Sequence, residues 1–325
     1  MTKVKPVLLG LEGGVLTNEE RSFFAQLQPF GFILFQRNCL NPAQLKSLTN
    51  DLRETVQRED VPIFIDQEGG RVARLKPPCW PDFPAARVLG EAYEKDPASG
   101  LHAAAQHARE ISFMLSEVGI NGNCAPVLDL LVAGASDAIG DRAFSADPDV
   151  AAACGRQMVE NMMACGVMPV IKHFPGHGRV KIDPHLDLPF VDAPLEVLEQ
   201  QDFKPFAALR DAPCGMNCHV VFNAIDDAAP VSLSKRAHDE IIRGALGFEG
   251  LLFSDDLAMG ALKMPIEERG RLALEAGADV VLFCRGVLEE SQAFCADLPE
   301  ISDAASARWE RARKQIKNCH CEEGL

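Results

Sequence analysis

The segment from residue 171 to residue 189, IKHFPGHGRVKIDPHLDLP, concentrates side chains that exchange protons or bind metals. It contains three histidines, His173, His177 and His185, and two aspartates, Asp183 and Asp187. Imidazole and carboxylate groups at this density are typical of a metal site or of a site for acid–base chemistry. The glycines of the same segment add a third possibility, a loop that binds phosphate.

The metal and phosphate interpretations each lack a structural requirement. His173 and His177 have the i,i+4 spacing of two zinc ligands on one face of a helix. Pro175 and Gly176 lie between them, and a proline inside a helix removes a hydrogen bond and clashes with the preceding turn. The glycines do not follow the GxxxxGK[ST] order of a phosphate loop. We therefore expect no metal and no cofactor in this segment.

The acid–base interpretation requires a carboxylate beside an imidazole, and Asp183 and His185 provide that pair. A carboxylate that accepts a hydrogen bond from one ring nitrogen orients the ring and stabilises its protonated form. Such a histidine both donates and accepts a proton near neutral pH. A partner nucleophile is then needed elsewhere, and Asp255 in FSDDLAMG is suited to it. Asp256 would cap the next helix, although both aspartates acting as caps stays an alternative.

The elements that would position these residues alternate along the chain. Short apolar segments predict strands at 7–12, 31–35, 62–66, 122–130, 168–174, 215–222, 250–256 and 279–284. Amphipathic segments predict helices at 18–28, 42–58, 98–118, 147–165, 194–211, 234–246, 265–276 and 286–298. Eight strands that alternate with helices favour an α/β fold, a (β/α)8 TIM-type barrel with a parallel sheet. We expect one domain over residues 1–325, with an extra helix at about 302–317 and a short polar tail.

A barrel of this kind has its active site at the carboxyl ends of the strands. The predicted strands end in six polar residues: Asp66, Asp129, Lys172, His173, His219 and Asp255. The loops that follow add Arg71, Arg74 and Arg142. Single residues of this kind often cap helices or lie in solvent. Together they suit a polyhydroxylated ligand that carries an amide or a carboxylate.

Composition restricts the partners and the compartment. The net charge of −15 disfavours nucleic acid and anionic membranes as partners. The first residues have too short an apolar run for a signal peptide, and no apolar run reaches the ~18 residues of a membrane span. Eleven scattered cysteines show no paired spacing. We expect a cytoplasmic protein with reduced thiols, whose oligomeric state the sequence does not define.

Several of these motifs together resemble the family 3 glycoside hydrolases, and most closely the single-domain bacterial β-N-acetylhexosaminidases. The motifs are KHFPGHG (172–178), the D-x-H of residues 183–185, DQEGGRVARL (66–75) and SDDLAM (254–259). GFILFQRN (31–38), APVLDL (125–130) and IGDRAF (139–144) agree as well. The resemblance extends from about residue 7 to about residue 285.

The resemblance implies a retaining glycosidase with Asp255 as nucleophile and with Asp183 and His185 as the acid–base pair. It implies that the sugar ring is bound by five further residues: Asp66, Arg74, Arg142, Lys172 and His173. His177 would belong to the loop structure and His219 to the pocket lining. The implied substrate is N-acetylglucosamine β-1,4-linked to anhydro-N-acetylmuramic acid, with or without peptide, a cell-wall fragment in peptidoglycan recycling.

This chain departs from the family at a few positions and leaves alternatives open. Pro184 stands where the family usually has serine between Asp and His, and we expect Asp183 to be extended, because a proline disfavours helical angles at the residue before it. Asn217 and Cys218 before His219 are also less typical. The alternatives are a β-glucosidase, which often has a second domain, an N-acetylglucosaminide phosphorylase, and a barrel that binds sugar without chemistry.

Overall fold

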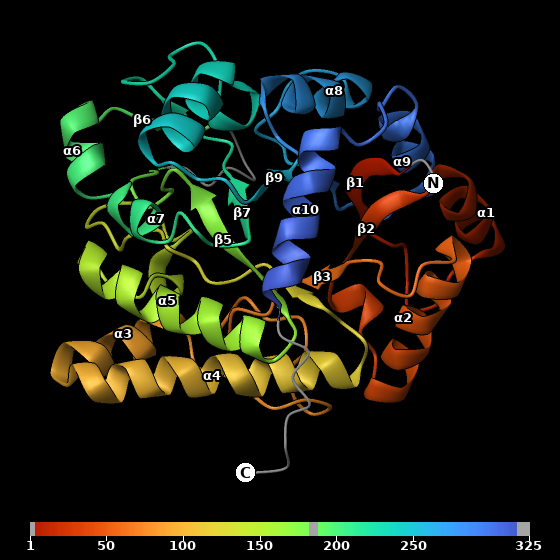
Figure 1. The fold of residues 1–325 in the computed structure, drawn as a ribbon, viewed down its shortest axis with the longest axis horizontal. Helices are drawn as coiled ribbons and strands as arrows, with labels where there is room; N and C mark the ends of the chain where they lie inside the picture. Colours follow the sequence, from red (N-terminus) through yellow and green to blue (C-terminus); the bar gives the residue numbers. More distant parts are fainter. Residues whose placement is uncertain (1–3, 182–187, 317–325) are drawn as a thin grey trace.

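The computed structural model of the protein describes residues 4–181 and 188–316, which form a closed barrel surrounded by helices (Figure 1). All neighbouring barrel strands are parallel. The strands in order around the barrel are β1 (Lys5–Leu9), β2 (Pro29–Leu34), β3 (Ile63–Ile65), β4 (Gly122–Asn123), β5 (Met168–Phe174), β7 (Cys214–Asn217), β9 (Leu251–Asp256) and β10 (Val280–Phe283). The predicted (β/α)8 fold is confirmed.

Two strands differ from their predicted extents. β4 has only two residues, and beyond it the Ala125 amide turns back to donate to the Asn123 carbonyl at 2.8 Å. The chain meets β5 again where the Val170 amide donates to the Ala125 carbonyl at 3.0 Å and through a bridge between Val127 and Lys172. The segment predicted as a strand at 215–222 is divided into β7 and β8 (Val221–Phe222). β8 leaves the barrel and pairs with β6 (Phe190–Val191) in a separate two-stranded sheet. The turn between β7 and β8 directs His219 toward the end of β9.

Helices cover the outside of the barrel. They are α1 (Asn18–Leu27), α2 (Pro42–Val56), α3 (Ala86–Lys95), α4 (Pro97–Glu117), α5 (Pro148–Ala164), α6 (Leu195–Gln200), α7 (Lys204–Ala208), α8 (Ile266–Ala276), α9 (Leu288–Cys295) and α10 (Asp303–Gln315). There are also short 3₁₀ helices η1 (Gln36–Asn38), η2 (Gly140–Arg142) and η3 (Val231–Leu233), and a π-helix η4 (Ala237–Ala245).

Local sequence explains most of these boundaries. Thr17 and Glu20 form a capping box at the start of α1. Gly119, Gly166 and Gly277 follow helices with positive φ, a conformation that glycine adopts at no steric cost. The helix predicted at 194–211 is two short helices, and Pro205 lies in the first turn of the second. Helix α3 lies outside the helical segments predicted from the sequence.

The barrel interior is filled by apolar side chains, so the barrel is not a channel. Phe64 and Phe253 meet edge to face inside it, with ring centroids 5.4 Å apart. Helix α10 covers the amino ends of the strands, where Trp309 packs on Phe30 and Arg308 pairs with Asp279 at 2.7 Å (Figure 1). The carboxyl ends of the strands remain open. Within the described residues, no helix combines the length and the hydropathy needed to span a bilayer.

Candidate active site

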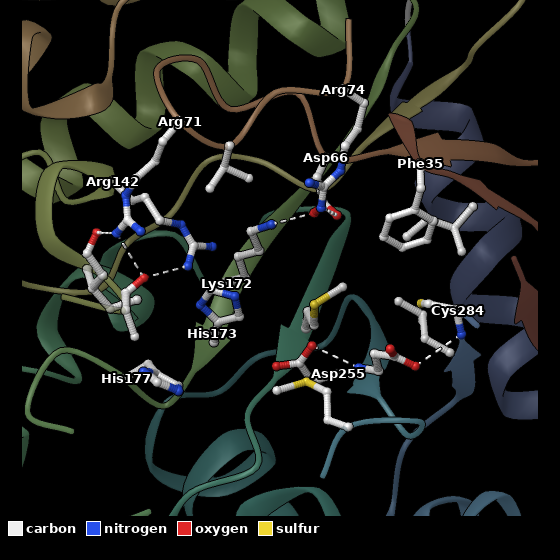
Figure 2. Close-up of a pocket in the computed structure, with 18 residues that line it drawn as sticks. Phe35, Asp66, Arg71, Arg74, Arg142, Lys172, His173, His177, Asp255 and Cys284 are labelled. Atoms are coloured by element: carbon white, nitrogen blue, oxygen red, sulfur yellow. Dashed lines mark hydrogen bonds and ion pairs between the residues drawn. The ribbon is translucent and has the colours of Figure 1, made fainter. Parts of the chain in front are cut away.

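A cavity of about 320 Å³ opens at the carboxyl ends of the strands (Figure 2). Residues from at least five of the barrel strands and from the loops after them line it. The cavity includes six residues predicted for the site: Asp66, Arg74, Arg142, Lys172, His173 and Asp255. The structure therefore brings these positions together, as the barrel prediction required.

The charged wall of the cavity is centred on Lys172 of β5, whose side chain is 3% exposed. Its Nζ lies 2.8 Å from Oδ1 of Asp66 and 2.8 Å from Oε1 of Glu68. Arg74 donates to the other oxygen of Asp66 at 2.9 Å. Arg142 binds both oxygens of Glu68, each at 2.8 Å. Three cations thus share two carboxylates, and Asp66, Arg74, Arg142 and Lys172 of this group line the cavity.

These charges control one another. Burial acts against ionisation of Glu68, but Arg142 and Lys172 outweigh it and lower the pKa of Glu68 to about 2. The pKa of Asp66 is lowered in the same way, since Lys172 and Arg74 outweigh its burial. Burial of Lys172 is likewise outweighed by Asp66 and Glu68, which raise its pKa. All three groups are ionised at neutral pH, and the wall can both donate to and accept from the hydroxyl groups of a ligand.

Glu68 was not predicted to belong to the site, although Glu68 lies in the same QEGGR motif as Arg71. The feature that could have indicated it is its position two residues after the strand-end residue Asp66. The GG turn that follows returns the chain beneath the cavity, because Gly69 and Gly70 have positive φ, and Gly69 contacts the Pro84 backbone too closely for any Cβ.

Asp129 and His173 form a second polar group. Nδ1 of His173 lies 2.6 Å from Oδ2 of Asp129, and the backbone amides of His173 and His177 donate to Oδ1 of Asp129 at 3.2 and 2.6 Å. Burial raises the pKa of Asp129, but His173 and these contacts outweigh it and lower that pKa. The ionised carboxylate therefore fixes Nδ1 of His173 as the protonated nitrogen. The ring then lines the cavity in a defined orientation.

His177 also lines the cavity, beyond the loop role that the family resemblance implied. Its ring centroid is 5.7 Å from that of His173. Burial and the neighbouring His173 lower its pKa to about 4, so it is neutral at neutral pH. Within residues 4–181 and 188–316, no group of three or more His, Cys, Asp or Glu side chains could hold a metal ion.

Asp255 and Asp256 have different environments at the end of β9. The Asp255 amide donates to Oδ1 of Asn217 at 3.3 Å, and Oδ1 of Asp255 accepts from the Asp256 amide at 2.8 Å. Asp256 accepts from the amides of Ala258 and Cys284, each at 3.0 Å, and so joins the turn after β9 to β10. Enclosure raises the pKa of Asp256. For Asp255, His219 and His173 outweigh enclosure and lower the pKa.

His219 lies behind the cavity, although the resemblance implied that it lines the pocket. It has no exposed surface, and Nε2 lies 3.0 Å from the Asp256 carbonyl. A carbonyl only accepts, so Nε2 donates, and Nδ1 faces the Ser232 hydroxyl at 2.7 Å. His219 therefore supports the backbone that carries the two aspartates. The predicted acid–base residues, Asp183 and His185, lie outside the described residues.

Comparison with known proteins places this arrangement in a family. The model of the glycosyl hydrolase family 3 N-terminal domain matches residues 4–317. The chain belongs to glycosyl hydrolase family 3. A beta-hexosaminidase of Bordetella avium is 38% identical over 283 residues, covering 86% of this chain and 80% of that protein. A second beta-hexosaminidase, from Alkalilimnicola ehrlichii, is 40% identical over the same length.

Solved structures agree with this family membership. NagZ from Neisseria gonorrhoeae, in complex with N-trifluoroacetyl-D-glucosamine, is 34% identical with a TM-score of 0.86, over 95% of this chain and 90% of that one. A family 3 β-N-acetylglucosaminidase from Paenibacillus is 29% identical with a TM-score of 0.87, over 96% of this chain and 61% of that one. The family 3 enzyme described here is thus a glycoside hydrolase of the β-N-acetylhexosaminidase type.

Proposed function

We propose that this family 3 enzyme releases N-acetylglucosamine from β-linked glycosides with retention of configuration, and that Asp255 is the nucleophile. The observation that carries the proposal is the state of Asp255. It lies at the carboxyl end of β9, lines the cavity, and has a pKa below the ordinary value of an aspartate. A carboxylate that is ionised and held by its backbone is suited to attack on an anomeric carbon.

The wall opposite Asp255 would bind the sugar. In Figure 2, Asp66 and Arg74 lie across the cavity from Asp255, with Lys172 and His173 between them. Paired charges of this kind offer donors and acceptors to several hydroxyls at once. The relative from Neisseria gonorrhoeae binds an N-acylated glucosamine, which supports a 2-acetamido sugar as the ligand of this cavity.

The reaction would proceed in two steps. In the first, an Asp255 oxygen attacks C1, the bond to the leaving oxygen breaks, and His185, protonated beside Asp183, gives that oxygen its proton. In the second, His185 takes a proton from water, the water oxygen bonds to C1, and the bond to Asp255 breaks. Two inversions give net retention. A histidine in place of the usual second carboxylate repels an anionic acceptor less, so phosphate would compete with water.

We further propose that the natural substrate is N-acetylglucosamine β-1,4-linked to anhydro-N-acetylmuramic acid, with or without peptide, and that the enzyme acts in peptidoglycan recycling in the cytoplasm. The support is the motif resemblance together with the relatives named beta-hexosaminidase. This substrate places an acetamido sugar in the cavity and an anionic sugar at its mouth, where Arg71 lies.

Parallel assays test the function. The enzyme should hydrolyse 4-nitrophenyl N-acetyl-β-glucosaminide far faster than the corresponding β-glucoside. Faster cleavage of the glucoside would indicate a β-glucosidase. Phosphate in the assay should leave N-acetylglucosamine as the main product, whereas N-acetylglucosamine 1-phosphate as the main product would indicate a phosphorylase. Tight sugar binding without turnover of either glycoside would indicate a protein that binds sugar and catalyses no reaction on it.

A further inference from the structure

A buried pair of polar side chains, Asn217 and His238, lies behind Asp255 and outside the cavity lining. Asn217 ends β7 and has no exposed surface, and His238 in η4 is 1% exposed. Nδ2 of Asn217 lies 3.0 Å from Nε2 of His238, and Oδ1 of Asn217 accepts from the Asp255 amide at 3.3 Å. A continuous chain of hydrogen bonds therefore joins the π-helix to Asp255.

This chain of hydrogen bonds begins where the backbone pairing between β7 and β9 ends. β7 and β9 pair through three residues, and the last pair is Met216 with Phe253. Beyond Phe253, the Asp255 amide no longer meets a backbone carbonyl of β7, and the side chain of Asn217 supplies the acceptor. The position of Asp255 thus depends on the orientation of an amide side chain.

The donors and acceptors allow only one proton arrangement. Nδ1 of His238 lies 2.9 Å from the Ser234 carbonyl, which only accepts, so Nδ1 carries a hydrogen. The Asp255 amide donates, so Oδ1 of Asn217 must face it, and Nδ2 must face His238. Nε2 of His238 is then the acceptor, and the ring is neutral. Burial, which lowers the pKa of His238, favours the same state.

We propose that neutral His238 is a positioning residue: it holds the amide of Asn217 in the orientation that fixes the backbone of the nucleophile Asp255. A hydrogen on Nε2, or an apolar side chain in place of the ring, would leave the NH2 of Asn217 without its acceptor. The amide would then be free to turn and present a donor to the Asp255 amide. The residue before the π-helix also holds the ring, because the Ser234 carbonyl accepts from both the backbone amide and Nδ1 of His238.

The test compares three variants by kcat and KM on an aryl N-acetyl-β-glucosaminide. His238→Leu removes the acceptor, and we expect kcat/KM to fall about 10- to 100-fold, the scale of a small misplacement of a reacting group. His238→Gln can restore an acceptor oxygen near Nε2 and should recover most of the loss. Ile241→Ala, a buried apolar change on the same π-helix, should lower the melting temperature and leave kcat/KM near the wild-type value. The loss in His238→Leu should fall on kcat, with KM unchanged.

Further measurements separate positioning from packing. In ¹⁵N-histidine-labelled wild-type enzyme, the His238 signal, assigned by its disappearance in His238→Gln, should show an unprotonated Nε2. Asn217→Ala combined with His238→Leu should cost little more than either change alone, because both break one link. Equal losses for the Leu and Gln variants, full activity of His238→Leu, or a protonated Nε2 would overturn the proposal.

The proposal rests on Asp255 being the nucleophile, which Asp255→Asn tests separately. An inactive Asp255→Asn beside a fully active His238→Leu would overturn only the role of His238. An active Asp255→Asn would overturn the nucleophile assignment itself. If His238→Leu does not fold, the ¹⁵N measurement on the wild-type enzyme still decides the proton arrangement on which the proposal depends.

Discussion

Nδ1 of His173 lies 2.6 Å from Oδ2 of Asp129, a carboxylate with no exposed surface at the base of the cavity. The same carboxylate accepts from the backbone amides of His173 and His177. The buried Asp129 carboxylate therefore fixes the position of the proton on the His173 ring, the backbone of His173 and the start of the loop after β5.

Replacing Asp129 by Asn should lower kcat/KM by about 100-fold. Asp129 accepts from three N–H groups, and the NH2 of an asparagine would face one of these donors, so His173 would be displaced. Steady-state kinetics on an aryl N-acetyl-β-glucosaminide measures the loss. Asp279→Asn is the matched control, since Asp279 is a buried carboxylate paired with Arg243 and Arg308 at the opposite end of the barrel. That variant should lose stability but keep its kcat/KM. Equal kinetics for both variants would remove Asp129 from the site.

The ion pairs of Glu68 with Lys172 and Arg142 should make the free energy of unfolding depend on pH. The pKa of Glu68 falls from 4.5 to about 2 on folding, so the unfolded chain binds a proton more readily. The stabilisation is therefore complete above pH 4.5 and is lost as the pH falls from 4.5 toward 2. Glu68→Gln should cost about 3–5 kcal/mol at pH 7, because buried Arg142 loses its carboxylate partner and Lys172 loses one of its two.

Urea unfolding of the wild type and of Glu68→Gln at pH 7 and pH 3 measures this effect. The difference in unfolding free energy between the two proteins should shrink at the lower pH, where the wild type begins to lose the same charge. A difference that is constant or larger at pH 3 would contradict the assignment of an ionised Glu68.

Chelation should leave the activity unchanged. Nδ1 of His173 is committed to Asp129, and His177 follows Pro175 and Gly176 in the loop, so the two rings do not share a helical face. The measurement is the hydrolysis rate after dialysis against EDTA and again after addition of zinc. Loss of activity on dialysis and its recovery with zinc would show that the histidines of residues 171–189 serve a metal.

His185→Ala should slow cleavage of a natural disaccharide far more than release of an activated aryl group. A sugar alcohol needs a proton to leave, and general acid help is worth about 10²–10⁴-fold. An aryl oxide with an acidic conjugate acid leaves without it. In that variant the second step becomes limiting for the aryl substrate, and azide should raise the rate. Asp183→Ala should show the same pattern more weakly.

Equal losses on both substrates, without rescue by azide, would make His185 a residue of binding or structure. The aryl N-acetylglucosaminide and the disaccharide must be compared at saturating concentrations, so that a change in affinity is not taken for a change in the chemical step.

The fold followed from the sequence because the strands are continuous apolar runs between amphipathic helices, a pattern that few architectures share. The positions Asp66, Lys172 and Asp255 followed from the rule that barrel sites lie at strand ends. Contacts between distant segments were not predictable in this way. Glu68 acquires its importance only when Arg142, far along the chain, reaches back to it. Asn217 ends β7 and His219 lies in the turn that leaves the barrel, and no periodicity indicates that both side chains lie behind the cavity.

Secondary structure was harder to predict where one side chain changed the backbone. β4 ends after two residues, where the Ala125 amide turns back onto the Asn123 carbonyl, and Pro205 lies in the first turn of the second of the two helices that replace a predicted one. The helix predicted at 234–246 is a π-helix, which the apolar pattern does not distinguish from an α-helix. Its irregular geometry accompanies the contact of His238 with Asn217.

The central claim is that Asp255 forms a covalent bond to the sugar, and the mass of the enzyme during turnover tests it most directly. His185→Ala, mixed with an aryl N-acetyl-β-glucosaminide and quenched in acid, should accumulate a species heavier by one N-acetylglucosaminyl group. Peptic digestion should place that group on Asp255, and Asp255→Asn should show neither the adduct nor turnover. Turnover of the aryl substrate with no adduct on Asp255, or an active Asp255→Asn enzyme, would contradict the account.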